Sequence, residues 1–198
     1  MAQHMTGRRM AGRALFLDRD GVVNVDHGYV HRIADVDFVP GIFDLARVAA
    51  GLGFRLVVVT NQSGIARGLY GPAAFRELTA WMAGRFAAEG APLAGVFHCP
   101  HLPGGTPPFD RDSFWRKPNP GMILEAAIRL DLDVGRSILV GDQTSDMAAA
   151  RAAGVGLRIA FGAGTKGGTL DADHAADDLA ALARDLHKLA GPLLSSVA

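Results

Sequence analysis

Two carboxylates separated by a single residue are the most specific chemical feature of this chain. Asp18 and Asp20 follow the apolar residues 14–17 and precede Gly21. A short apolar run predicts a buried strand, and open α/β sheets place their chemistry at the carboxyl ends of strands. Two acids at such a position can hold a divalent cation while one attacks an electrophile and the other moves a proton. Because acids and glycine are also ordinary turn residues, this motif is a weak signal when taken alone.

Further polar side chains follow two other apolar runs. Thr60 and Asn61 come at the end of the second run, and Asp142 comes shortly after a third. Lys117 lies in an irregular stretch before a helical segment. These residues add a hydroxyl, an ammonium and a third carboxylate to the acid pair. Their order along the chain, each near the boundary of an expected element, favours a common site.

This set of groups meets the needs of phosphoryl transfer to a carboxylate. We expect Asp18 to form an aspartyl-phosphate, and Asp20 to protonate the leaving alcohol and later deprotonate the attacking water. A dianionic phosphate repels a carboxylate, so positive charge must be supplied by a cation such as Mg²⁺. We expect Mg²⁺ to be bound at Asp18, Asp20 and Asp142, by the carboxylates of Asp18 and Asp142 and by a backbone carbonyl near Asp20. Lys117 would neutralise the phosphoryl group from another side, and Thr60 would orient it.

Simpler roles remain open for some of these residues. Asp142 precedes a helical segment and could serve only as its N-cap. Asp146 could be an acid of the first helical turn, favoured there by the helix dipole. Thr60 and Asn61 could be ordinary turn residues at a strand end.

The chain alternates strand-like and helix-like segments, which predicts an α/β fold with a parallel sheet and right-handed crossovers. Strands are expected at residues 14–17, 54–60, 95–98, 137–140 and 156–160, and helices at 72–89, 120–130, 143–153 and 176–189. The irregular stretches 24–39 and 99–119 are the expected walls of a pocket. We expect a disordered leader at 1–12 and a single domain at 13–192.

Length and composition limit the classes of function. The 198 residues, of which 49% are hydrophobic, suffice for one globular domain. No apolar run approaches the roughly 20 residues of a membrane-spanning helix. With 20 basic and 20 acidic residues, the chain gives no indication of a nucleic-acid or anionic-membrane partner. Cys99 is the single cysteine, which excludes an internal disulfide and favours a cytoplasmic location.

Four stretches are similar to the motifs of haloacid dehalogenase (HAD) superfamily phosphatases. They are residues 17–21, 59–60, Lys117 and 141–146, in this order. Within the superfamily, the chain most resembles the D-glycero-D-manno-heptose 1,7-bisphosphate phosphatases, with histidinol-phosphate phosphatases as the sister group. The stretches that carry this narrower resemblance are 18–24, 26–30, 60–68 and 116–122.

The resemblance implies a Rossmann-like, three-layer α/β/α fold without a cap domain, and the short spacing from Asp20 to Thr60 agrees. It implies hydrolysis of the C7 phosphate of a heptose bisphosphate, a sugar phosphate, in a reaction that feeds nucleotide-activated heptose for lipopolysaccharide or capsule. Because a cap domain is absent, we expect a monomer. Arg116 would meet the distal phosphate, although it could also be a solvated loop charge. The substrate-binding residues implied in this way are Asp26, His27, Gly28, Tyr29, Asn61, Gln62, Ser63 and Arg116.

The chain departs from the family where many members carry a structural zinc. Cys99 and His101 keep the first pair of ligand positions, but Ser113 and Trp115 occupy the second pair. Structural zinc requires four closed ligands, so we expect no zinc here. As a hypothesis, Phe109, Phe114 and Trp115 would pack this loop in place of the metal.

A second departure is Gln143, where relatives often carry a lysine near the metal and phosphate. Alternatives to the heptose-bisphosphate assignment are a histidinol-phosphate phosphatase, another small sugar-phosphate phosphatase, or a catalytically silent binding protein with this fold. The guanidinium of Arg116 would repel the amine of histidinol phosphate. The complete set of acids, hydroxyl and ammonium argues against a silent protein.

Overall fold

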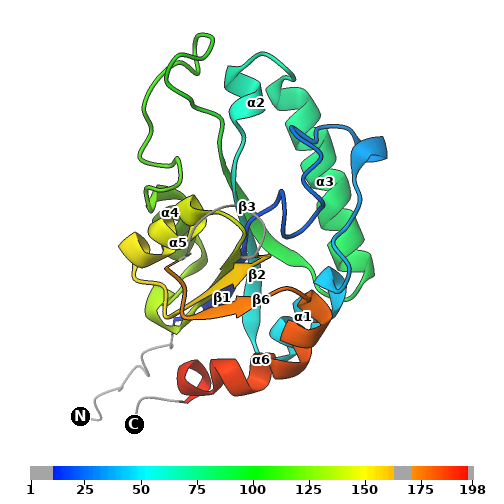
Figure 1. The fold of residues 1–198 in the computed structure, drawn as a ribbon, viewed down its shortest axis with the longest axis vertical. Helices are drawn as coiled ribbons and strands as arrows, with labels where there is room; N and C mark the ends of the chain where they lie inside the picture. The colour runs from blue at the N-terminus through cyan, green and yellow to red at the C-terminus, as the bar shows by residue number, and fades with distance from the viewer. Residues whose placement is uncertain (1–10, 163–170, 196–198) are drawn as a thin grey trace, which may run out of the picture.

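The computed structural model describes residues 11–162 and 171–195. Within these residues, a parallel six-stranded sheet has the strand order β3-β2-β1-β4-β5-β6 (Figure 1). This is the α/β fold that the alternating segments predict. The strands are β1 (Arg13–Leu17), β2 (Phe54–Asn61), β3 (Leu93–Cys99), β4 (Ile138–Gly141), β5 (Leu157–Phe161) and β6 (His174–Ala176).

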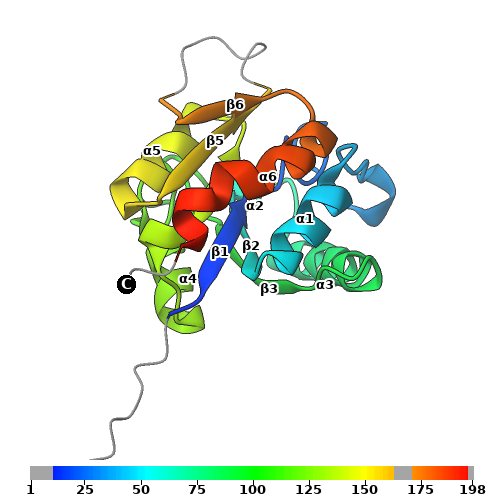
Figure 2. The same cartoon turned by 90° about the horizontal axis from the view of Figure 1, so that it is seen from below.

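Helices cover both faces of the sheet and complete three layers. One face carries α1, α3 and α6, and the opposite face carries α4 and α5 (Figures 1 and 2). The helices are α1 (Ile42–Gly51), α2 (Ser63–Ala66), α3 (Pro72–Ala88), α4 (Gly121–Leu130), α5 (Thr144–Ala153) and α6 (Leu179–Leu194), with 3-10 turns at Ile33–Asp35 and Val134–Arg136.

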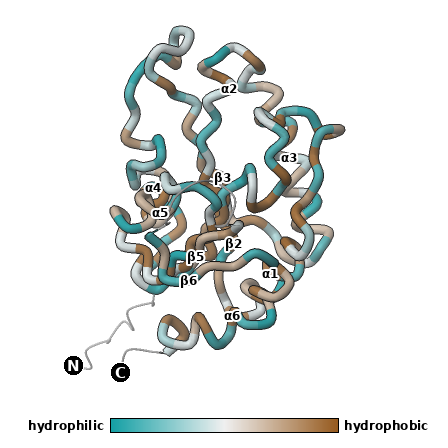
Figure 3. The backbone as a smooth tube through the Cα atoms, in the orientation of Figure 1, coloured by the Kyte–Doolittle hydropathy of each residue, from teal (hydrophilic) through white to brown (hydrophobic). Residues whose placement is uncertain are grey.

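Strand β1 lies in the middle of the sheet and is buried on both faces. Leu15 and Leu17 belong to the apolar core under α1, α3 and α6, whereas Ala14 and Phe16 belong to the core under α4 and α5. Successive side chains of a strand point to opposite faces, so a strand covered on both sides needs an uninterrupted apolar run. Figure 3 shows the hydrophobic residues concentrated in the sheet, while polar residues dominate the long loops.

Helix α1 was not predicted from the sequence. Its buried residues Ile42, Leu45, Ala46 and Ala49 follow the spacing of one helical face. The helix is short, and its first turn follows Gly41, which has a φ of +85°. A Cβ at Gly41 would lie 2.4 Å from the backbone nitrogen of Ala180 in α6, so glycine is required by this close approach.

The C-terminal helix begins later than expected. Residues His174–Ala176 pair with β5 as a sixth strand instead of starting the helix. The Asp178 side chain accepts a hydrogen bond from the Ala180 N–H at 2.8 Å and caps α6. At the other end of the chain, residues 1–10 of the expected leader lie outside the described residues, and Gly12 pairs with Leu132.

The two long irregular stretches rise at the carboxyl end of the sheet. The segment between β1 and α1 contains the 3-10 turn Ile33–Asp35 as its single regular element, so no inserted domain lies there. The loop from β3 to α4 extends beyond the sheet beside α2 (Figure 1). Among the described helices, none has the length and apolar character needed to cross a membrane.

Candidate active site

The carboxyl ends of three neighbouring strands bring the candidate catalytic residues together. In the sheet, β1 pairs with β2 on one side and β4 on the other, so Asp18, Thr60 and Asp142 lie at adjacent strand ends. A cavity of about 400 Å³ opens at this edge. Its lining consists of Asp18, Asp20, Asp26, Gly28, Tyr29, Thr60, Asn61, Gln62, Ser63, Gly64, Tyr70, Lys117, Gln143 and Ser145.

Lys117 is buried among carboxylates although it arrives from the distant loop. Its Nζ lies 2.8 Å from Oδ1 of Asp18 and 2.5 Å from Oδ1 of Asp146, and it donates to the carbonyl oxygen of Val59 at 3.0 Å. The residues Lys117 and Asp18 are 4% and 7% exposed, respectively. The ammonium is therefore fixed beside the carboxylate that we expect to attack phosphorus.

Burial and charge strongly perturb this pair. Burial, followed by repulsion from Asp146, raises the pKa of Asp18 to about 8, although Lys117 acts in the opposite direction. Burial opposes the charged form of Lys117, but attraction to Asp146 and Asp18 outweighs it and raises the lysine pKa. The site thus concentrates negative charge that one ammonium does not fully balance.

Three carboxylates gather at one point of this site. Asp18, Asp142 and Asp146 each offer an oxygen atom, and these atoms all lie within 4.8 Å of one another. Oxygen ligands at this spacing are the chemistry that Mg²⁺ prefers. The N-cap of α5 is Gln143, so Asp142 does not have the capping position that was its simpler alternative.

Asp146 is both an acid of the first turn of α5 and a partner of Lys117. One carboxylate oxygen accepts the backbone N–H of Gln143 at 3.0 Å, as expected for an acid in the first turn of α5. The other forms the ion pair with Lys117, and the residue is 1% exposed. The Gln143 amide, where a lysine was expected in relatives, donates to Oδ2 of Asp142 at 2.9 Å.

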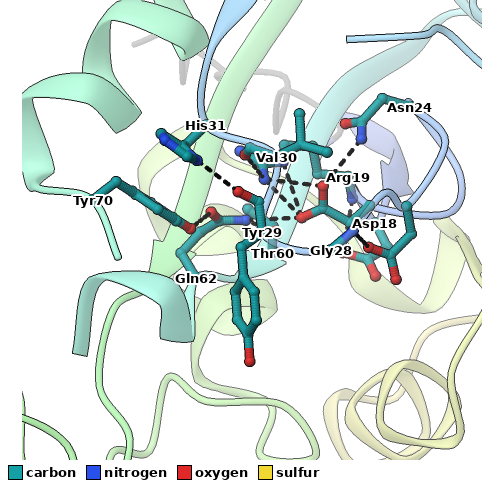
Figure 4. A network of polar contacts seen from close by, with 12 residues as sticks. Asp18, Arg19, Asn24, Gly28, Tyr29, Val30, His31, Thr60, Gln62 and Tyr70 are labelled. Atoms are coloured by element: carbon teal, nitrogen blue, oxygen red, sulfur yellow. Dashed lines mark hydrogen bonds and ion pairs between the residues drawn. The ribbon is translucent and has the colours of Figure 1, made fainter. Parts of the chain in front are cut away.

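The Asp20 carboxylate faces a separate set of donors. Arg19 binds both carboxylate oxygens, with Nη2 at 3.0 Å from Oδ1 and 2.8 Å from Oδ2, and also donates to the carbonyl of Val30. Asn24 donates to Oδ1 at 3.0 Å and Gln62 to Oδ2 at 3.1 Å (Figure 4). This side chain is not in the three-carboxylate cluster, so contact with a cation there would use the backbone carbonyl instead.

Asn61 contacts the protein backbone rather than leaving its amide open for substrate. Its Nδ2 donates to the carbonyl of Lys117 and its Oδ1 accepts the Lys117 N–H, both at 3.0 Å. The carbonyl of Val59 holds the same lysine by its Nζ. The end of β2 therefore forms hydrogen bonds with both the backbone and the Nζ of Lys117.

The residues that the resemblance assigns to substrate binding divide into two groups. Asp26, Gly28, Tyr29, Asn61, Gln62 and Ser63 line the cavity, whereas His27 and Arg116 are absent from its lining. Nε2 of His27 lies 2.7 Å from Oδ2 of Asp37. Arg116 donates through Nη1 to the carbonyl of His101 at 3.3 Å. Tyr29 has a φ of +55°, and in Figure 4 its ring extends away from the polar network.

The loop with the altered zinc positions is only partly packed by aromatic side chains. Trp115 packs against the core under α4 and α5, and the Phe109 ring lies 5.8 Å from that of His101. The hypothesis is wrong for Phe114, which is 61% exposed. The imidazole of His101 faces the guanidinium of Arg111, with Nη2 2.9 Å from Nε2.

Sequence reasoning missed three side chains that line or support the cavity. Arg19, between Asp18 and Asp20, is 2% exposed. The sequence gives no sign of this burial, because arginine side chains are mostly exposed in proteins. Tyr70 and Ser145 also reach the cavity lining. Ser145 lies inside the fourth motif, so its position was a usable signal, but Tyr70 lies in a loop with no periodic pattern.

Known proteins share both this sequence and this architecture. A family model described as HAD-hydrolase-like matches residues 114–188. A D-glycero-alpha-D-manno-heptose-1,7-bisphosphate 7-phosphatase of Burkholderia mallei is 54% identical over 151 residues, which are 76% of this chain and 80% of the relative. The chain belongs to the heptose-bisphosphate phosphatase family of the HAD superfamily.

Other members of the heptose-bisphosphate phosphatase family extend the match. The D-glycero-beta-D-manno-heptose-1,7-bisphosphate 7-phosphatase of Yersinia pestis is 47% identical over 165 residues, 83% of this chain and 87% of the relative. The crystal structure of the B. bronchiseptica D,D-heptose 1,7-bisphosphate phosphatase, complexed with magnesium and phosphate, superposes with a TM-score of 0.77 at 33% identity, covering 89% of this chain and 98% of that one. As a family member, this protein is a phosphoric monoester hydrolase.

Proposed function

We propose that this protein is a Mg²⁺-dependent phosphatase that removes the C7 phosphate of D-glycero-D-manno-heptose 1,7-bisphosphate. One observation carries the proposal: Lys117 holds Asp18 at 2.8 Å beside a cluster of carboxylates, on the wall of a cavity lined by Asp20 and Thr60. The relatives described above are named for this substrate, and the groups gathered in this cavity support the same reaction here. The product would supply nucleotide-activated heptose for lipopolysaccharide or capsule.

The chain's own residues account for both chemical steps. Asp18 attacks phosphorus, and the bond from phosphorus to the C7 oxygen breaks as Asp20 donates a proton to that oxygen. Asp20 then accepts a proton from the water that attacks the aspartyl-phosphate, which releases phosphate and regenerates Asp18. Lys117 offsets the charge of the phosphoryl oxygens, and Thr60 orients them.

The cluster of Asp18, Asp142 and Asp146 fits a divalent cation. Three buried carboxylate oxygens within 4.8 Å of one another repel, and a hard cation with oxygen ligands relieves that repulsion. Asp18 and Asp142 would hold Mg²⁺ directly, together with a backbone carbonyl near Asp20, while Asp146 stays paired with Lys117. When bound, Mg²⁺ supplies positive charge against the phosphate.

Binding of Mg²⁺ is testable without measuring activity. A ligand that binds only the folded state raises the unfolding temperature. We expect millimolar Mg²⁺ to raise the unfolding midpoint of the wild type, and Asp142→Asn to remove that increase. Asp185→Asn, which changes an exposed acid of α6, should retain it. An equal increase in Asp142→Asn and the wild type would contradict the assigned site.

Comparing substrates tests the reaction itself. The printed names of the relatives specify the α-anomer in one case and the β-anomer in the other, so both anomers belong in the assay. We expect kcat/KM for at least one anomer to exceed that for histidinol phosphate by at least tenfold, because both relatives are named for heptose bisphosphate. Preference for histidinol phosphate would overturn the proposed substrate.

A further inference from the structure

Tyr70 contacts the catalytic centre through a buried glutamine. It lies between α2 and α3, and its hydroxyl donates to Oε1 of Gln62 at 2.6 Å (Figure 4). Gln62 is 1% exposed, and its backbone N–H donates to the carbonyl of Cys99. The hydroxyl therefore reaches an amide whose backbone is already fixed at the end of β2.

The opposite end of the Gln62 amide binds two catalytic residues. Its Nε2 donates to Oδ2 of Asp20 at 3.1 Å and to Oγ1 of Thr60 at 2.8 Å. If the amide were rotated by half a turn, its oxygen would face Oδ2 of Asp20, which already accepts from the Arg19 guanidinium, and two acceptors would be in contact. The Tyr70 hydroxyl, by donating to Oε1, favours the orientation in which the NH₂ group faces Asp20.

The Tyr70 ring is itself held in place from two sides. It stacks on the imidazole of His31, with ring centroids 4.8 Å apart and an interplanar angle of 6°. On another side it approaches Gly64 so closely that a Cβ there would lie 2.2 Å from Cε1 of the ring. Burial, the largest cause, raises the pKa of Tyr70 to about 12, so its hydroxyl remains a donor at neutral pH.

We propose that Tyr70 is a positioning residue of this phosphatase, which orients Asp20 and Thr60 through the amide of Gln62. The inference rests on the proposed function, in which Asp20 transfers the proton. Arg19 and Asn24 hold Asp20 from the other side, so Gln62 provides its contact with the end of β2. A small rotation of Asp20 would increase the distance between its carboxylate and the reacting oxygen atoms. Proton transfer over a longer distance is slower, so kcat would fall.

Tyr70→Phe removes the hydroxyl and keeps the ring. We expect kcat to fall by about three- to tenfold, the range for one lost neutral hydrogen bond, while KM changes less than about twofold. The loss should occur with heptose bisphosphate and with p-nitrophenyl phosphate. In a Gln62→Ala background the same substitution should have no further effect on kcat, because the amide that transmits it is absent.

A second variant tests the position of the ring. Gly64→Ala retains the hydroxyl but places a methyl group against the Tyr70 ring, so it should also lower kcat. An unchanged kcat in either single variant, a loss confined to KM, or an undiminished effect of Tyr70→Phe in the Gln62→Ala background would overturn the proposal.

The two substrates separate this proposal from the proposed function. If the wild type hydrolyses heptose bisphosphate no better than p-nitrophenyl phosphate, the substrate assignment fails. The ratio of kcat in each variant to kcat in the wild type, measured with p-nitrophenyl phosphate, still tests the role of Tyr70. A folded wild type that is inactive on both substrates would overturn both.

Discussion

Asp18→Asn will yield a folded protein without measurable phosphatase activity. The amide keeps the shape of the side chain but cannot attack phosphorus, so no aspartyl-phosphate forms. Folding should survive, because Lys117 keeps its ion pair with Asp146. The pKa of Asp18 is raised from 3.8 to about 8 in the folded protein, so the free energy of unfolding of the metal-free protein falls as the pH rises between these values. A neutral amide at this position avoids that loss.

Two measurements check this prediction. Acid quenching during turnover of a ³²P-labelled substrate should trap label on the wild type and none on Asp18→Asn. The unfolding midpoint of the variant in metal-free buffer at pH 8 should be no lower than that of the wild type. Activity within tenfold of the wild type would contradict the nucleophilic role of Asp18.

Lys117→Met should damage both stability and catalysis. Methionine fills a similar volume, but it leaves Asp18 and Asp146 buried without their shared cation. Removing one partner of a buried ion pair typically costs about 3–5 kcal/mol. We expect a loss of this size in metal-free urea unfolding, and a fall of kcat by about 10²–10³ because the phosphoryl charge is no longer offset.

Lys188→Met is the matched control, since it makes the same substitution at an exposed lysine of α6. Its unfolding free energy should remain within about 0.5 kcal/mol of the wild type. A loss below about 1 kcal/mol in Lys117→Met would show that the carboxylates do not depend on the ammonium, and the electrostatic description of the site would be wrong.

The central strands of the sheet were predictable from sequence because they are buried on both faces. Residues such as Phe16 and Val58 belong to uninterrupted apolar runs, which chemistry-bearing residues follow directly. Helix α1 was missed, although Ile42, Leu45 and Ala49 repeat at helical spacing. Strand β6 is only three residues long, and its pairing with β5 depends on tertiary position that no local pattern carries.

The candidate site also contains residues that were predictable from sequence and residues that were not. Asp18, Thr60 and Asp142 could be predicted to lie together because the topology brings strand ends to one edge of the sheet, whatever the length of chain between them. The burial of Arg19 and the contact of Tyr70 with Gln62 depend on how loops cross that edge. Residue types and spacing do not specify these crossings, and for this reason Phe114 was wrongly expected to be packed.

The double contact between Asn61 and the backbone of Lys117 has an evolutionary consequence. A lysine anchored to a strand end does not rely on the preceding loop for its location. Insertions and deletions in that loop can accumulate while the Lys117 ammonium stays beside the Asp18 carboxylate. Substrate recognition can therefore drift among descendants of this fold without the chemistry being rebuilt.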